Sequence, residues 1–279
     1  MRKLIALCAV LALTVGLAAC GDDDGGTATT DPSTTDGDSD FTPREDGILT
    51  VGTELPAPPF WEGDDYDAIT GGYEVDLAKE IAKRLGDLEF KPVNYPFAGV
   101  NAGAECECDL VFSQITITDE RKANWDFTTP YFDSDQGLLT LTGTDVADVA
   151  AAKALQFGVQ TETTGLDFLN DTLQPDKETR VYDTTVDMFN ALAAGDVDAI
   201  LFDVPILLGA IKGGQVSDAK IVAQFKTGEQ YGGILPKDSA NTAAVNAAMQ
   251  AIIDDGTLAE LQEKYFGVPT ADAAPFWEA

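Results

Sequence analysis

The chain has 279 residues, enough for one large or two ordinary domains, and its 48 Asp and Glu against 17 Lys and Arg give a formal net charge of −31. This charge argues against a nucleic-acid-binding protein, because a phosphate-binding face needs clustered basic side chains. The absence of His excludes Ser-His-Asp and Cys-His catalytic sites and imidazole zinc sites. The sequence also lacks a calcium loop, a phosphate-binding loop and a dinucleotide-binding glycine motif, so we expect no metal and no cofactor, while carboxylate chemistry remains possible.

The N-terminus has the pattern of an export signal. Arg2 and Lys3 form a positive start, and residues 4–17 form an apolar core that is too short for a membrane span. The core ends in Leu-Ala-Ala-Cys20-Gly, which resembles the bacterial lipobox, where the Cys becomes the lipidated first residue of the mature protein. We predict a lipoprotein signal peptide over residues 1–19 and lipidation of Cys20; an ordinary signal peptide with an incidental Cys is the alternative.

The next segment is rich in Asp, Gly, Thr and Ser and nearly free of apolar side chains. Such a composition buries too little surface to offset the entropy lost on ordering. We therefore expect residues 20–46 to form a lipid-anchored flexible linker, which as a random coil would reach about 25–30 Å.

Two successive α/β units are predicted after residue 46. In the first, strands are expected over 48–52, 88–93 and 109–112, with helices over 73–85 and 97–104. In the second, strands are expected over 137–142, 155–159, 179–182, 199–202 and 221–225, with helices over 165–169, 186–194 and 206–211. A strand-like run at 230–235, helices over 240–253 and 257–265 and a C-terminal tail follow. Alternating strands and helices indicate an α/β fold with mostly parallel pairing.

A polar loop follows the apolar run Leu110–Phe112. It contains Ser113, two Thr residues and then Arg121 at the foot of a short charged turn. A guanidinium fork beside hydroxyl groups suits a small carboxylate. On the local sequence alone, a surface loop whose Arg makes a salt bridge is an equal alternative.

Four separated stretches carry a family resemblance. They are Gly72-Tyr-Glu-Val-Asp-Leu-Ala-Lys-Glu-Ile-Ala-Lys-Arg-Leu85, Ile115-Thr-Ile-Thr-Asp-Glu-Arg121 with Asp126-Phe127, Asp198-Ala-Ile-Leu-Phe-Asp203, and Asp255-Gly-Thr-Leu to Tyr265-Phe-Gly267. Through them, about residues 47–268 resemble the bacterial extracellular solute-binding proteins, family 3, which serve polar amino-acid ABC transporters.

The resemblance implies an α/β, two-lobed periplasmic-binding-protein-like (type II) clamshell with two crossover hinge strands. Lobe 1 would comprise residues 47–136 and 232–268, and lobe 2 residues 137–231. The crossings would lie near 131–137 and 231–234, and 269–279 would be a C-terminal tail. The ligand would sit between the lobes.

The resemblance also assigns the groups that hold the backbone of an amino acid. Arg121 would bind the α-carboxylate, with Thr116 beside it, and Asp203 would pair with the α-ammonium. Thr163 and Thr164 open a helix, so their N–H groups would meet the carboxylate from lobe 2. Helix N-capping is the alternative for the two Thr residues and for Asp203.

Other positions would shape the rest of the pocket. Ser113 and Gln114 would add polar contacts, and Phe97 would form an aromatic wall unless it only packs the core. Glu54 and Gln160 would face the ligand side chain and favour a polar or cationic one.

Ala57 departs from the family pattern, in which an aromatic side chain often stacks at this position. The pocket would then be wider, or Trp61 would substitute. Cys106 and Cys108 flank one residue; outside the cytoplasm a disulfide between them is possible, but the two-residue spacing leaves bridged and free states equally open.

We therefore expect a monomeric, membrane-anchored extracytoplasmic lipoprotein without catalytic residues that delivers a polar or charged amino acid to an ABC-transporter permease. The alternative is an enzyme on the same fold, either prephenate/arogenate dehydratase-like or peptidoglycan-active, in which a Glu such as Glu54 acts as acid. A signalling receptor domain is the third class considered.

Overall fold

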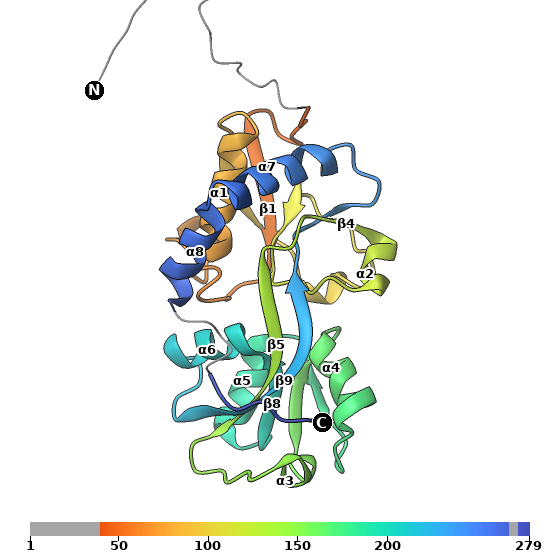
Figure 1. Ribbon diagram of the computed structural model, residues 1–279, viewed down its shortest axis with the longest axis vertical. Coiled ribbons are helices and arrows are strands. Elements are labelled where there is room, and N and C mark those ends of the chain that lie inside the picture. Colours follow the sequence, from red (N-terminus) through yellow and green to blue (C-terminus); the bar gives the residue numbers. More distant parts are fainter. Residues whose placement is uncertain (1–39, 268–272) are drawn as a thin grey trace, which may run out of the picture. The chain divides into compact units, whose positions relative to one another are not determined.

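Two five-stranded sheets organise the chain, each inside its own lobe (Figure 1). The computed structural model describes residues 40–267 and 273–279, all within one compact unit, Asp38–Ala279. The predicted signal peptide, Cys20, most of the linker and residues 268–272 lie outside the described residues. We call the described parts built on the two sheets the first lobe and the second lobe.

The first lobe contains the sheet β2-β1-β3-β10-β4. β1 pairs in parallel with β2 and β3, whereas β10 runs antiparallel to β3 and β4. The strands are β1 (Ile48–Thr53), β2 (Glu89–Asn94), β3 (Leu110–Val111), β4 (Trp125–Phe127) and β10 (Ile234–Pro236). Because parallel strands end at one edge of a sheet, the loops that follow β1 and β3 lie next to each other.

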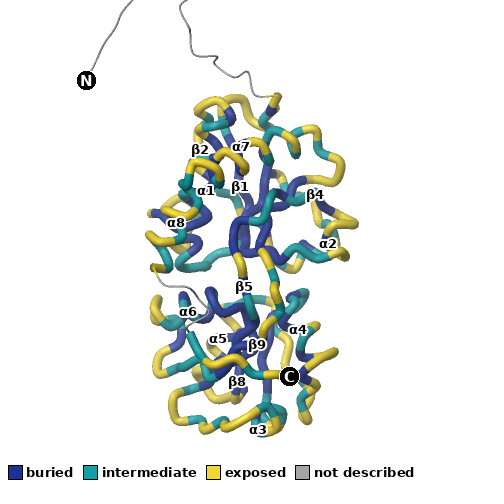
Figure 2. Tube along the Cα trace, viewed as in Figure 1, coloured by how far each residue is buried: buried dark blue, intermediate teal, exposed yellow. Residues whose placement is uncertain are grey.

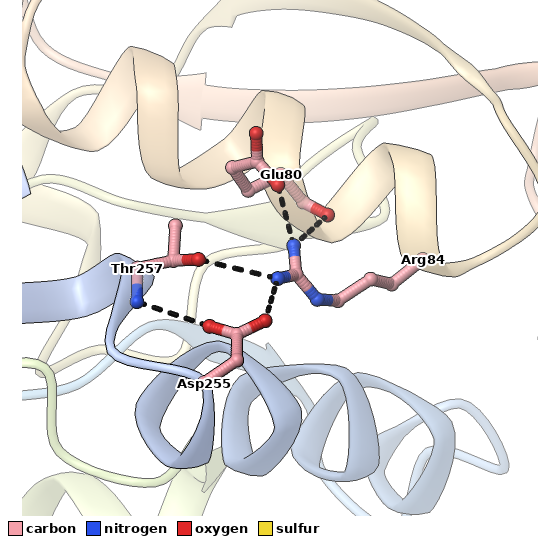
Figure 3. A network of polar contacts seen from close by, with 4 residues as sticks. All are labelled: Glu80, Arg84, Asp255 and Thr257. Carbon is pink, nitrogen blue, oxygen red and sulfur yellow. Dashed lines mark hydrogen bonds and ion pairs between the residues drawn. The ribbon is translucent and has the colours of Figure 1, made fainter.

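Helices α1 (Tyr73–Arg84), α7 (Thr242–Asp254) and α8 (Thr257–Phe266) pack together in this lobe. The apolar side chains of α1 recur with helical spacing and are buried, which anchors the helix on β1. At its exposed end, Arg84 contacts Glu80 at 2.5 Å and Asp255 at 2.6 Å (Figure 3). This polar network ties α1 to the α7–α8 turn. The lobe is completed by α2 (Asp119–Asn124) and the 3-10 turns η1 (Tyr66–Ala68) and η2 (Phe97–Gly99).

The second lobe contains the sheet β7-β6-β8-β5-β9. Its parallel part joins β7, β6 and β8, and the antiparallel part adds β5 and β9. Separate apolar clusters, one containing Leu139 and the other Leu138, pack against the sheet. The elements are β5 (Phe132–Leu141), α3 (Val149–Lys153), β6 (Phe157–Gln160), α4 (Thr164–Phe168), η3 (Leu169–Leu173), β7 (Arg180–Tyr182), α5 (Thr185–Ala194), β8 (Ala199–Asp203), α6 (Val204–Lys212) and β9 (Ala219–Tyr231).

β5 and β9 connect the lobes as one antiparallel pair (Figure 1). We call the segment that pairs Phe132–Ser134 with Glu229–Tyr231 the crossover ribbon. Next to it the register shifts, and Asp135 Oδ1 accepts hydrogen bonds from the backbone N–H groups of Thr227, at 2.9 Å, and Gly228, at 3.0 Å. Gly228 has φ +68°, which favours glycine. Figure 2 shows partly exposed chain here, between the buried strands of the lobes.

The C-terminal segment packs on the second lobe. The N–H group of Gln224 in β9 donates to Pro275 O at 2.9 Å, and the N–H group of Trp277 donates to Gln224 O at 2.8 Å. Trp277 also packs against the apolar cluster of Leu138. Of the predicted tail, residues 275–277 therefore attach to the β9 edge of the second sheet through one isolated parallel bridge between Gln224 and Phe276.

Several local predictions differ from the structure. The helix predicted over 97–104 is only the 3-10 turn η2, and the two strands predicted over 221–225 and 230–235 are one long β9 followed by β10. Helices α2 and α3 and strand β4 were not predicted. In the part of the chain that the structure describes, no helix has the length and apolar character needed to cross a membrane.

Candidate functional site

A cavity lies between the two lobes, where β1 and β3 of one sheet and β6 and β8 of the other end. The volume of the cavity, counted as the space that the centres of water molecules can occupy, is about 40 Å³. All ten side chains predicted to hold a ligand line it. The lining residues are Glu54, Pro56, Ala57, Pro58, Phe97, Ser113, Gln114, Thr116 and Arg121 from the first lobe, and Gln160, Thr163, Thr164, Thr185, Phe189, Phe202, Asp203, Ile206 and Gln215 from the second.

Arg121 is held rigidly at the cavity wall. It lies in α2, whose N-cap Thr118 accepts a hydrogen bond from the Arg121 N–H group. Its side chain donates from Nε to Asn101 Oδ1 at 2.9 Å, from Nη1 to Thr116 O at 2.8 Å and from Nη2 to Glu162 O at 2.8 Å. A guanidinium carries five N–H groups, so part of the fork is uncommitted.

The charge of Arg121 is buried without a close counter-charge. The residue is only 2% exposed, and among the described residues it makes no ion pair. Burial lowers the pKa of Arg121, and the more distant charges of Asp203 and Glu229 oppose that effect. Its guanidinium lies 5.4 Å from the centre of the Phe97 ring. The alternative of a surface salt bridge is therefore wrong.

Asp203 ends the buried strand β8 and faces the cavity. Its Oδ1 accepts from Gln136 Nε2 at 2.5 Å, and its Oδ2 accepts from the Tyr231 hydroxyl at 2.5 Å. Asp203 occupies the N-cap position of α6, but its side chain makes no capping hydrogen bond. Burial raises the pKa of this carboxyl. Helix capping therefore does not account for the side chain.

Glu54 and Gln160 meet across the cavity. Glu54 follows β1 and Gln160 ends β6, and Gln160 Nε2 donates to Glu54 Oε1 at 3.0 Å. The other oxygen, Glu54 Oε2, accepts from the Phe97 N–H group at 2.9 Å. Burial raises the pKa of Glu54. These side chains give one end of the cavity a polar lining.

Ser113 and Gln114 lie where β3 leaves the first sheet. Ser113 Oγ accepts from the Glu54 N–H group at 3.3 Å. Gln114 has φ +50°, and both its backbone N–H and its side-chain amide donate to Glu74, at 2.9 and 2.6 Å. The amide of Gln114 is thus already bonded to a core carboxylate.

Thr163 and Thr164 open α4 as predicted. Thr163 caps the helix, because its hydroxyl accepts from the Leu166 N–H group at 3.2 Å and donates to Gln160 O at 2.8 Å. Thr164 differs, since its hydroxyl donates to Glu229 at 3.0 Å. Capping therefore explains the Thr163 hydroxyl, whereas that of Thr164 points to the crossover ribbon.

Trp61 does not replace the aromatic side chain that Ala57 lacks. It is fully buried in the core of the first lobe, where its Nε1 donates to Glu74 Oε2 at 2.6 Å, and it does not line the cavity. Cys106 and Cys108 form a disulfide bond, one of the two states left open by the sequence. Over residues 40–267 and 273–279, no cluster of three or more Cys, Asp or Glu side chains is arranged to hold a metal ion.

Three polar residues near the cavity were missed in the sequence. Asn101 and Gln136 bond directly to Arg121 and Asp203, and Glu229 bonds to Thr116 and Thr164. A signal existed for two of them: Gln136 lies within the predicted first crossing, and Glu229 lies two residues before the predicted second crossing.

Comparisons with known proteins agree with this arrangement. The family model for bacterial extracellular solute-binding proteins, family 3, matches residues 49–268. The L-cystine-binding protein TcyJ of Escherichia coli (strain K12) is 34% identical over 231 residues, covering 80% of this chain and 84% of TcyJ. A solved structure of an ancestral arginine-binding protein bound to glutamine has a TM-score of 0.72 at 31% identity, covering 80% of this chain and 99% of that one.

A further solved structure bears on catalysis. It is the ancestral amino-acid-binding protein AncCDT-1, a precursor of cyclohexadienyl dehydratase, with a TM-score of 0.69 at 27% identity over 79% of this chain and 96% of that one. The two-lobed α/β fold predicted from the sequence is confirmed by these neighbours. The chain belongs to the bacterial extracellular solute-binding proteins of family 3.

Proposed function

We propose that this protein captures a polar or charged amino acid between its lobes and delivers it to the permease of an ABC transporter. The observation that carries the proposal is the pair of opposite buried charges, Arg121 and Asp203, on the two walls of one cavity. Buried charges are costly unless they are paired or ligated. A free amino acid supplies both counter-charges at once.

The carboxylate of the amino acid lies at Arg121. Its guanidinium forms charge-assisted hydrogen bonds in a fixed fork, and the bonds to Asn101 and to two backbone carbonyls hold that fork in place. Thr116 lies beside it, and Thr163 and Thr164 line the same cavity from the second lobe at the start of α4. The ammonium lies at Asp203, whose carboxyl is oriented by Gln136 and Tyr231.

The side chain of the amino acid extends toward Glu54 and Gln160. Their carboxylate and amide favour polar or cationic groups, while Phe97 gives an aromatic wall. Ser113 and Gln114 close the lobe 1 side of the pocket. The two lobes close on the amino acid because binding shifts an open–closed balance only through contacts made to both sides.

The predicted lipid anchor and linker suit a protein that delivers its ligand at a membrane surface. Lipidation of Cys20 anchors the monomer outside the cytoplasm, and the linker over 20–46 lets the lobes reach a permease. In the proposal, residues 47–136 and 232–268 form lobe 1, residues 137–231 form lobe 2, and the crossover ribbon is the hinge.

A thermal-shift panel of the twenty standard L-amino acids and L-cystine tests the proposal. At about a hundred times Kd, a bound amino acid stabilises the native state by about 2.7 kcal/mol. At least one polar or charged amino acid should raise the melting temperature. A folded protein whose melting temperature no amino acid changes would contradict the receptor function.

The second candidate function is a dehydratase-like or peptidoglycan-active enzyme. Similarity to the precursor AncCDT-1 and the raised pKa of Glu54, caused by burial, favour it. Against it, both carboxyl oxygens of Glu54 already accept hydrogen bonds. Incubation with prephenate, arogenate or peptidoglycan fragments, followed by mass spectrometry, separates the functions: turnover that Glu54→Gln abolishes would establish the enzyme.

A further inference from the structure

Glu229 lies on β9 within the crossover ribbon and accepts hydrogen bonds from the first lobe, the second lobe and β5. Its Oε2 accepts hydrogen bonds from Thr164 Oγ1 of the second lobe at 3.0 Å and from Gln136 Nε2 of β5 at 3.0 Å. Thr116 Oγ1 of the first lobe donates to the same oxygen at 3.4 Å. One carboxylate oxygen therefore joins both lobes and the ribbon.

Glu229 is also close to the predicted ammonium site. The same Gln136 Nε2 atom lies 2.5 Å from Asp203 Oδ1 and 3.0 Å from Glu229 Oε2, so the two carboxylates flank one amide. Gln136 is fully buried, and its Oε1 accepts no hydrogen bond within the described part of the chain. Two neighbouring carboxylates and a buried, unpartnered acceptor form an environment that a cation stabilises.

We propose that Glu229 is a specificity-determining residue, which forms with Asp203 a two-carboxylate receptor for the ammonium group of the amino acid. The inference rests on the proposed function of the cavity. Glu229 also contacts Thr116 and Thr164 from opposite lobes, so an ammonium that attracts its carboxylate strengthens the closed arrangement.

The electrostatics of the cavity side support this assignment. Burial, and then repulsion from Asp203, raise the pKa of Glu229 to about 7. The other ionisable groups on this side are Arg121, which favours the charged carboxylate, and the Tyr231 hydroxyl, which is bonded to Asp203. Without a bound ammonium, Glu229 is therefore largely protonated below this pH.

A second groove along the ribbon has a different set of charges. This groove is lined by Glu229 together with Asp133, Asp135, Lys226 and Glu263 of α8. Lys226 pairs with Asp135 at 2.9 Å, and Gln230 donates to Asp133 at 2.8 Å. These side chains make no hydrogen bond to Glu229, so its bonded neighbours are those of the cavity.

The affinity for an amino acid should depend on pH. An ammonium beside Glu229 favours the charged carboxylate and lowers its pKa, so binding releases a proton when the free protein is protonated. Affinity for an amino acid should then increase with pH up to about 7, by at most tenfold per pH unit, and level off above that value.

The test is a binding titration of wild type and Glu229→Gln below and above the pKa of about 7. The probes are L-arginine and L-glutamine, each beside the analogue that lacks the α-amino group, 5-guanidinopentanoate and 5-amino-5-oxopentanoate. Glu229→Asp retains the charge, and Asp133→Asn removes an acid of the same ribbon whose carboxylate bonds to Gln230 and not to Glu229. Circular dichroism confirms that each variant is folded.

Glu229→Gln should lose at least tenfold in affinity for the amino acid that wild type binds, lose the pH dependence, and bind the desamino analogue as wild type does. Glu229→Asp should keep the pH dependence, and Asp133→Asn should match wild type. Two results would overturn the role of Glu229 and leave the proposed function intact. One is a Glu229→Gln variant with the affinity and pH profile of wild type, and the other is an equal loss of affinity for the amino acid and for its analogue. A wild-type protein that binds neither these probes nor any other amino acid would overturn the proposed function as well.

Discussion

At the residue scale, the two charged groups of the cavity, Arg121 and Asp203, form hydrogen bonds only with neutral partners. Arg121 donates three hydrogen bonds to neutral acceptors and none to a carboxylate. Asp203 accepts from an amide and a phenol, again without a cation within ion-pair distance among residues 40–267 and 273–279. The protein thus orients both charges with neutral neighbours and leaves each able to bind the opposite charge of a ligand.

Arg121→Ala should strongly weaken binding of the amino acid found by the panel. Removing one partner of a buried, hydrogen-bonded charge pair costs about 2–5 kcal/mol, or roughly thirtyfold to several thousandfold in affinity. Equilibrium titration measures the loss. Arg84→Ala is the matched control, because Arg84 makes its ion pairs at the lobe surface and does not line the cavity (Figure 3). Equal affinity of Arg121→Ala and wild type would refute the role of Arg121.

The groups at this scale differ in how well the sequence predicted them. Arg121, Thr116 and Asp203 lie in contiguous motifs at strand ends, so local sequence placed them at the cavity. Asn101, Gln136 and Glu229 reach the cavity only through tertiary packing. Gln136 and Glu229 lie in or beside the predicted hinge crossings, whereas no local pattern distinguishes Asn101 from a surface polar residue. The stacking role considered for Trp61 failed because its indole is bonded to Glu74 in the core.

At the element scale, Glu74 joins segments that are distant in sequence. It lies in α1 with no exposed surface, and its carboxyl group accepts from Trp61, Gln114 and the Tyr131 hydroxyl. These donors belong to the loop after β1, the loop after β3 and the chain just before the crossover ribbon. Burial raises the pKa of Glu74, and the donated hydrogen bonds oppose that shift.

Glu74→Ala should destabilise the protein by about 3–5 kcal/mol, because it leaves several buried donors unpaired. Urea unfolding measures the change. Glu80→Ala on the same helix removes a partly exposed i,i+4 ion pair with Arg84, which is worth at most about 1 kcal/mol. Similar stabilities of the two variants would show that the Glu74 network contributes little.

The regular elements were largely predictable, and the exceptions have physical causes. α1 and the buried strands β1 and β8 have clear apolar periodicity. β9 was split in the prediction because residues 226–230 are polar and its C-terminal end crosses between the lobes, where no core imposes alternation. The short α2 and α3 contain too few turns to give a periodic signal.

At the scale of the whole molecule, the chain contributes to the second lobe twice. The main segment enters through β5 and leaves through β9, and residues 273–279 return to the β9 edge after α8 of the first lobe. The sequence predicted only an acidic, Ala-rich tail there. Its docking depends on a single parallel bridge and on Trp277, which a compositional argument does not detect.

Trp277→Ala should lower the stability by about 1–2 kcal/mol, less than for a fully buried Trp, because the side chain is only half-buried. Its neighbour Phe276 is 44% exposed, so Phe276→Ala should change stability little. Thermal unfolding of both variants gives the comparison. A destabilisation by Phe276→Ala as large as that by Trp277→Ala would contradict this packing.

The central claim is that one amino acid bridges the lobes with its carboxylate at Arg121 and its ammonium at Asp203. A crystal structure of the protein with the amino acid selected by the panel tests it most directly. We predict that a carboxylate oxygen lies about 2.7–2.9 Å from an Arg121 Nη atom and that the ammonium contacts an Asp203 carboxyl oxygen. An amino acid bound outside this cavity, or with its carboxylate directed away from Arg121, would contradict the account.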